Sequence, residues 1–181
     1  MNTEQPTSGA HPVASSEHPA LAEVAANGGP PTAVARTPAI VADVGEIVFE
    51  ILVAVMWSDG ELASVEVECG RAAADVMQIR PKRGGSLGAM ADGPLPFPAI
   101  AFDRVDASGR RLAYAAACWL DDASEETSDR RTSFLAAVRT KLDLNDETVA
   151  RMRDLASAVR AEFEDARDAF AALMQRVYSP L

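Results

Sequence analysis

Histidine is scarce in this sequence of 181 residues, and its two copies, His11 and His18, both lie near the N-terminus. They belong to a segment rich in Pro, Ala, Ser, Gly and Thr, which cannot bury enough apolar surface to offset its ordering entropy. The predicted folded part of the chain therefore has no histidine for a Ser-His-Asp site, a Cys-His site or a zinc site. The Glu-x-x-His pairs of a ferritin-like di-iron site are also missing. We predict that the protein is not an enzyme.

Long apolar runs are absent as well. The longest, Ile47 to Trp57, is interrupted by Glu50 and is shorter than the roughly 20 residues that cross a bilayer. Residues 1–20 lack the basic start and the apolar centre of a signal peptide. Acidic residues outnumber basic ones by 27 to 17, for a net charge of −10, which disfavours nucleic-acid binding. We expect a cytoplasmic protein, not inserted in a membrane, that accepts a cationic or metal partner most readily.

Only two cysteines are present, Cys69 and Cys118, which is too few for a disulfide framework. Neither belongs to a Cys-x-x-Cys pair, and both lie in apolar stretches with helical spacing. This context is typical of buried free thiols, so we predict that neither cysteine is bridged.

Helical periodicity, by contrast, is abundant after the N-terminal segment. We interpret residues 1–38 as a disordered tail and residues 39–178 as one helical domain. Apolar residues of the domain recur at steps of three and four, and no stretch alternates as a strand does. The predicted fold class is all-α. The predicted helices span about residues 38–57, 64–78, 112–120, 125–142 and 149–178.

The last predicted helix is unusually long. Its apolar stripe runs from Val149 to Val177, about eight turns, and two small hairpins cover only part of it. Asn145 is predicted to cap the start of this helix. The distal residues either dock on the same chain, along its first helix near Val44, or pair with another chain. We favour docking on the same chain, and therefore a monomer over a homodimer.

A loop at residues 80–98 separates the two halves of the domain. It is rich in Gly and Pro and locally basic. Loops longer than about 15 residues are uncommon in compact domains, so this one is either functional or a tolerated insertion. Its Gly-Gly-Ser-Leu-Gly run follows no predicted strand and precedes no Gly-Lys-Ser/Thr, which argues against a phosphate-binding loop.

The only two tryptophans occupy the same place in a repeated pattern. Trp57 and Trp119 each end an apolar helix, and an aspartate follows two residues later, at Asp59 and Asp121. An amphipathic helix comes after each turn. The repeat predicts two similar helical hairpins packed about a pseudo-twofold axis. The hairpins would span residues 40–80 and 108–142.

The first turn, residues 59–66, reads DGELASVE. Its glycine, leucine and final glutamate match the sixth, eighth and twelfth places of an EF-hand loop. Val55 and Trp57 stand where the first and third oxygen ligands belong, so a true EF-hand is excluded. Two carboxylates, Asp59 and Glu66, nevertheless flank the turn.

An apolar helix followed by Asp-Gly-x-hydrophobic-x-x-x-Glu resembles the tellurite-resistance TerB-like family. In the second half, AYAAACWLDD followed by FLAAVRTKLDLNDETVARM resembles the alanine-rich helix, acidic turn and Leu-x-Leu-Asp junction of that family. The resemblance covers roughly residues 40–155. It implies an all-helical bacterial protein of two pseudo-symmetric halves, linked to stress responses, with acidic turns proposed to hold a metal ion.

Carried over to this chain, the resemblance assigns the first acidic site to Asp59 and Glu66. It assigns the aspartate of the second site to Asp121 or Asp122. A few carboxylates bind Ca²⁺ or Mg²⁺ weakly when water completes the coordination shell. The alternative is that these acids only cap helices, which stabilises each helix by about 0.3–1 kcal/mol.

The second half departs from the family pattern. Asp122 stands where the glycine is expected, and Ser128 or Asp129 falls where the second glutamate is expected. Two function classes therefore remain open. One is a TerB-like, stress-associated binding module with a divalent metal at its acidic turns. The other is a helical protein-interaction or scaffold protein without metal, whose partner the sequence does not identify.

Overall fold

The computed structural model describes residues 42–79, 90–94, 96–124 and 128–179. The predicted tail, residues 1–38, and most of the predicted loop, residues 80–98, lie outside these ranges. The described residues all belong to one unit of the chain, Arg36–Leu181. They contain no strand, which confirms the all-α fold class. The α-helices are α1 (Ala42–Met56), α2 (Ser64–Val76), α4 (Ala107–Asp121), α5 (Asp129–Lys141), α6 (Asp146–Glu162) and α7 (Ala166–Tyr178), with 3₁₀ turns at Phe97–Ala99 and Phe102–Arg104.

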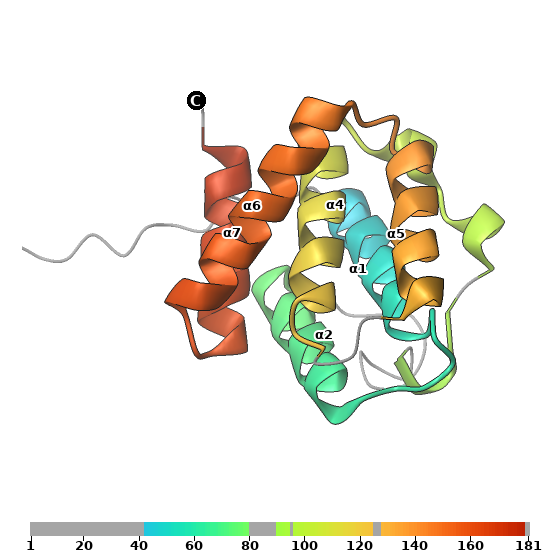
Figure 1. Ribbon diagram of the computed structural model, residues 1–181, viewed down its shortest axis with the longest axis horizontal. Helices are drawn as coiled ribbons and strands as arrows, with labels where there is room; N and C mark the ends of the chain where they lie inside the picture. Colours follow the sequence, from blue (N-terminus) through green and yellow to red (C-terminus); the bar gives the residue numbers. More distant parts are fainter. Residues whose placement is uncertain (1–41, 80–89, 95, 125–127, 180–181) are drawn as a thin grey trace, which may run out of the picture. The chain divides into compact units, whose positions relative to one another are not determined.

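Helix α4 is the centre of this unit, and it contacts α1, α5, α6 and α7 (Figure 1). Every residue from Leu112 to Leu120 is buried, and the alanines among them let neighbouring helices approach closely. Helix α1 is similar, because every residue from Ile47 to Met56 except Glu50 is buried. Helices that are apolar on all sides belong inside a core, so α1 and α4 hold the other helices in place.

The helix ends follow the capping signals of the sequence. Gly60 ends the turn after α1 with a positive φ of 95°, as predicted from its freedom to adopt this conformation. The predicted cap Asn145 is confirmed, since its side chain accepts a hydrogen bond from the Thr148 N–H at 2.8 Å. Asp106 caps α4 by accepting from the Gly109 N–H at 2.7 Å.

The prediction of one long helix over residues 149–178 is wrong. Two helices, α6 and α7, occupy this segment and are separated by a bend at Phe163, whose backbone is extended (φ −122°, ψ 127°). Asp165 then caps α7 by accepting hydrogen bonds from the N–H groups of Arg167 and Asp168, both at 2.9 Å. The apolar stripe concealed the bend because its spacing continues across it. The overlooked signal was an N-cap residue, Asp165, inside the stripe.

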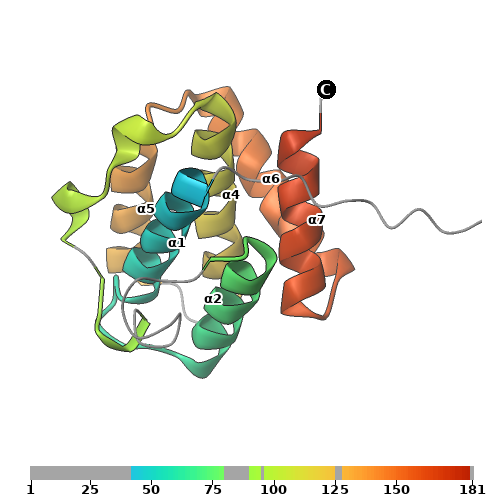
Figure 2. The ribbon, with the colours of Figure 1, turned by 180° about the vertical axis from the view of Figure 1, so that it is seen from behind.

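Helix α7 turns back beside α6 and also packs against α2 and α4 (Figure 2). Phe170, Leu173 and Val177 are buried there. These distal residues therefore dock on the same chain, but the predicted place along the first helix near Val44 is wrong, since their main neighbours are α2, α4 and α6. Within the described ranges, no helix combines the length and the apolar character that crossing a bilayer requires.

Candidate functional site

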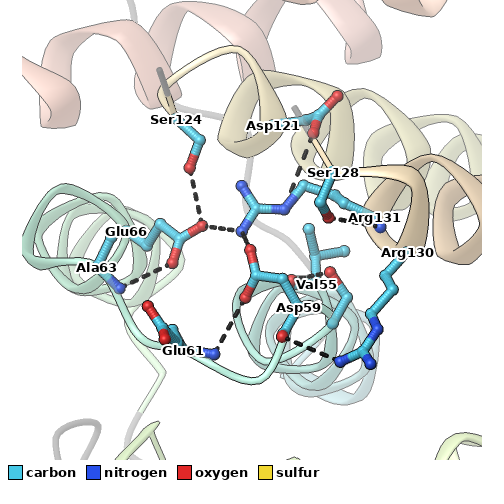
Figure 3. A network of polar contacts seen from close by, with 11 residues as sticks. Val55, Asp59, Glu61, Ala63, Glu66, Asp121, Ser124, Ser128, Arg130 and Arg131 are labelled. Carbon is cyan, nitrogen blue, oxygen red and sulfur yellow. Dashed lines mark hydrogen bonds and ion pairs between the residues drawn. The ribbon is translucent and has the colours of Figure 1, made fainter. Parts of the chain in front are cut away.

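The structure brings three of the four predicted site residues together. Asp59 lies in the turn after α1, Glu66 in the first turn of α2, and Asp121 at the end of α4. Their carboxylates surround the side chain of Arg131, which comes from the first turn of α5 (Figure 3). The site therefore joins the ends of both hairpins.

Arg131 is the cation at the centre of this cluster, and its side chain is only 1% exposed. Its Nη2 atom lies 2.5 Å from Asp59 Oδ2 and forms a second ion pair with Glu66 Oε1, whose side chain is equally buried. Its Nε atom lies 4.0 Å from Asp121 Oδ1. One guanidinium thus links three acidic residues from three different segments, and charge-assisted bonds of this kind are among the strongest in proteins.

The remaining oxygens of the two closest carboxylates are also occupied. Asp59 Oδ1 accepts a hydrogen bond from the Glu61 N–H at 3.2 Å. Glu66 Oε2 accepts from the Ala63 N–H at 3.0 Å, and Glu66 Oε1 accepts from Ser124 Oγ at 3.0 Å. All four oxygens of Asp59 and Glu66 therefore have a donor within the protein.

Arg131 and Glu66 hold equivalent positions in the two hairpins. Glu66 is the third residue after the N-cap position of α2, Ala63, and Arg131 is the third residue after the N-cap of α5, Ser128. The turn of the second hairpin is longer, so a search at a fixed distance from Asp121 stops short of Arg131. Counting from the N-cap would have found it.

Asp122 and Ser128 have other roles than those predicted by the resemblance. Asp122 Oδ2 accepts a hydrogen bond from Ser157 Oγ on α6 at 2.6 Å, so this side chain joins α4 to α6 and is not brought to the cluster. Ser128 caps α5 by accepting from the Arg131 N–H at 3.1 Å. Of the two candidates for the second aspartate, Asp121 is the one beside Glu66 and Arg131.

The side of the cluster around Asp121 is less completely paired. Burial raises the pKa of the Asp121 carboxyl, and the repulsion of Asp122 adds to this effect, while Arg131 opposes it. Among the described residues, Nε and Nη1 of Arg131 have no hydrogen-bond partner, although both are buried. The described contacts of the guanidinium are therefore strongest at Nη2, which forms two close ion pairs, and weakest at Nε and Nη1.

A cavity of about 540 Å³ opens beside the cluster. Among the described residues of its walls, three are acidic, Asp59, Glu61 and Glu66, and one is basic, Arg131. Negative charge therefore predominates in this described part of the lining. The other described lining residues are Leu62, Ala63, Val65, Ser124 and Ser128.

Comparison with protein families, curated proteins and solved structures gave no match for this chain. The TerB-like resemblance therefore stays a prediction, and the site is interpreted from its own geometry. The carboxylates of Asp59 and Glu66 converge as a metal site requires, but Arg131 Nη2 lies within ion-pair distance of both. A divalent ion would have to displace this atom. In the arrangement shown, the donor set fits a guanidinium and leaves no place for a metal ion.

The two cysteines are buried free thiols, as predicted. Burial raises the pKa of Cys69, and it raises the pKa of Cys118 to about 12. Because the thiolate is the reactive form of cysteine, both side chains are poor nucleophiles at neutral pH.

Proposed function

We propose that this domain is a TerB-like helical binding module in which Arg131 supplies the positive charge between the two acidic turns. One observation carries the proposal: the buried guanidinium pairs with Asp59 and Glu66 at the point where a metal ion would have to sit. The module then needs no metal to hold its two hairpins together. Its role in a bacterial stress response is part of the same proposal and rests on the resemblance alone.

The charge balance supports this arrangement. Carboxylates gathered at one site repel one another unless a cation compensates them. A Ca²⁺ or Mg²⁺ ion supplies two positive charges and requires several free oxygen ligands. Arg131 supplies one charge, and the oxygens of Asp59 and Glu66 already accept hydrogen bonds from it, from Ser124 and from backbone N–H groups.

The partner that suits this module is a protein presenting a basic side chain. After Arg131 is counted, the described walls of the adjacent cavity still carry more negative than positive charge. Glu61 is exposed at the cavity wall, where a Lys or Arg side chain of the partner can reach it. The net charge of −10 favours the approach of such a partner.

Calorimetric titration tests the role of Arg131. We expect no saturable heat when CaCl₂ or MgCl₂ is added up to millimolar concentrations. Saturable binding that disappears in Asp59→Asn, but persists in the matched control Asp154→Asn on the exposed side of α6, would overturn the proposal. The metal-binding alternative would then be adopted, with Arg131 displaced by the ion.

Titration with a lysine-rich peptide tests the choice of partner. Binding is expected to weaken with added salt and to weaken further in Glu61→Gln, because a charge facing the peptide is removed. Glu147→Gln, an exposed change at the start of α6, serves as the control. Equal binding by the Glu61 and Glu147 variants would place the peptide elsewhere.

A further inference from the structure

A second polar cavity lies at the opposite end of α4 from Arg131. It has a volume of about 510 Å³ and is formed by the start of α4, the first half of α6 and the last turn of α7. These three segments meet at the upper end of the view in Figure 1. Each contributes one arginine to the lining: Arg111 from α4, Arg151 from α6 and Arg176 from α7. We call this cavity the three-arginine groove.

The charge of the groove is opposite to that of the protein as a whole. Its described lining contains three arginines and no carboxylate, whereas the chain carries a net charge of −10. Three guanidinium groups around one cavity repel one another, and the packing of three separate helices brings them there. An anion between them would relieve this repulsion.

The arginines retain donors for a ligand. Arg111 Nη2 donates to Ser108 Oγ at 3.0 Å, which fixes the side chain, and no other described residue accepts a hydrogen bond from its remaining N–H groups. Arg176 Nη2 pairs with Glu162 at 2.6 Å, outside the groove lining. Arg151 is exposed, and no residue in the part of the chain that the structure describes forms a hydrogen bond or ion pair with it.

The hydroxyl groups narrow the class of ligand. Ser108, Tyr178 and Ser179 line the groove beside the arginines. A carboxylate has only two oxygens and is satisfied by one guanidinium fork, whereas a phosphate group offers more oxygens and up to two negative charges. The volume lies in the range of small-molecule sites and exceeds the need of a free phosphate ion. The rest of the described lining is apolar, from Met152, Leu155 and Val177, and suits the organic part of a ligand.

We propose that the three-arginine groove binds a small organic phosphate, with the phosphate group between Arg111 and Arg151 and an apolar portion against α6 and α7. Arg176 contributes the third positive charge while Glu162 holds it in place. The negative charge of the protein does not prevent this, because the groove and the acidic cluster lie at opposite ends of α4.

Titration of the full chain with phenyl phosphate and with inorganic phosphate, at constant ionic strength, tests the proposal. We expect saturable binding of both, tighter for phenyl phosphate because its ring covers apolar surface. Arg151→Gln should weaken binding about tenfold, since one charge-assisted contact is lost. Arg71→Gln, an exposed change on α2 outside the groove, should have no effect.

Two results would overturn the proposal. One is binding that is equal in the Arg151 and Arg71 variants, which would indicate general attraction of anions to surface arginines. The other is the absence of saturable binding by either phosphate compound. Arg151 is exposed, so its variant should keep the thermal midpoint of the unchanged protein, and Arg111→Gln with the same midpoint provides a second variant at the groove.

Discussion

The two Trp-x-Asp turns share a sequence pattern and differ in almost every contact. Trp57 is half-buried, and its Nε1–H donates to the Met90 carbonyl oxygen at 2.8 Å. Trp119 is completely buried and packs on Phe170, with ring centroids 5.2 Å apart. No described residue accepts a hydrogen bond from its Nε1–H. The difference follows from position, because the first turn lies at the margin of the unit and the second ends the central helix α4.

The aspartates differ in the same way. Asp59 is bound directly to Arg131 at 2.5 Å, while Asp121 lies 4.0 Å from the same guanidinium. The third residue after each N-cap completes the contrast, because it is Glu66 in one hairpin and Arg131 in the other. Because the second hairpin has an arginine where the first has a glutamate, the two helix starts carry opposite charges and attract each other. Two turns with the same sequence pattern can therefore carry opposite charges at the same position after the N-cap.

The strongest test of this comparison is removal of the shared cation. Arg131→Met leaves Glu66 buried without its charged partner, which is expected to lower the free energy of unfolding by about 3–5 kcal/mol. Urea unfolding measures this change. Calcium at millimolar concentration should restore part of the lost stability, because the variant exposes Asp59 and Glu66 to a cation.

The neighbouring residue provides the control. Arg130→Met changes an exposed side chain whose one hydrogen bond to a described residue is long, 3.5 Å, to the Asp59 carbonyl oxygen. It should alter stability by about 0.5 kcal/mol or less. Similar losses in the two variants would mean that Arg131 is not the centre of the site.

The second test compares the two aspartates. Asp59→Asn removes a direct ion pair and should lower the free energy of unfolding by about 1.5 kcal/mol, the low end for hydrogen bonds to charged groups, because Glu66 still pairs with Arg131. Urea unfolding of this variant beside Asp154→Asn measures the effect. A stability unchanged from that of the control would indicate that the short contact to Asp59 is not maintained in solution.

The fold was largely predictable from the sequence, and the site was only partly so. The spacing of apolar residues in α1 and α4 indicated buried helices, because burial leaves a local pattern. The bend at Phe163 was missed, since the apolar spacing is the same on both sides of it. Arg131 was missed because its partners lie 72 and 65 positions away along the chain, at Asp59 and Glu66, and a charged residue in a polar helix carries no sign of its burial.

The third test uses the difference between the two N-caps. Ser128 caps α5, whereas Ala63 at the same position of α2 has no side-chain oxygen, although Glu66 already bonds to the Ala63 N–H. Ala63→Ser would complete a capping box at an exposed position with suitable backbone angles (φ −75°, ψ 148°). We expect a gain of about 1 kcal/mol in thermal or urea unfolding. A loss would show that the turn cannot accept the second bond.

The smallest expected effect is that of Asp121→Asn. This change should raise the free energy of unfolding, whereas Asp59→Asn should lower it. Burial raises the pKa of Asp121 above 3.8, its ordinary value. The folded state therefore holds this proton more tightly than the unfolded state does. The stability contributed by the protonated carboxyl is complete below pH 3.8 and is lost as the pH rises through the folded pKa.

Asp121→Asn removes this loss, because an amide carries no charge to desolvate. The variant should be more stable than the unchanged protein at pH 7, by about 0.5 kcal/mol or less, and the difference should shrink toward pH 4. Urea unfolding of both proteins across this range measures it. A destabilised Asp121→Asn variant at pH 7 would mean that attraction to Arg131 outweighs desolvation. The two turns would then contribute to the cluster in the same way, and the contrast between them would be limited to their tryptophans.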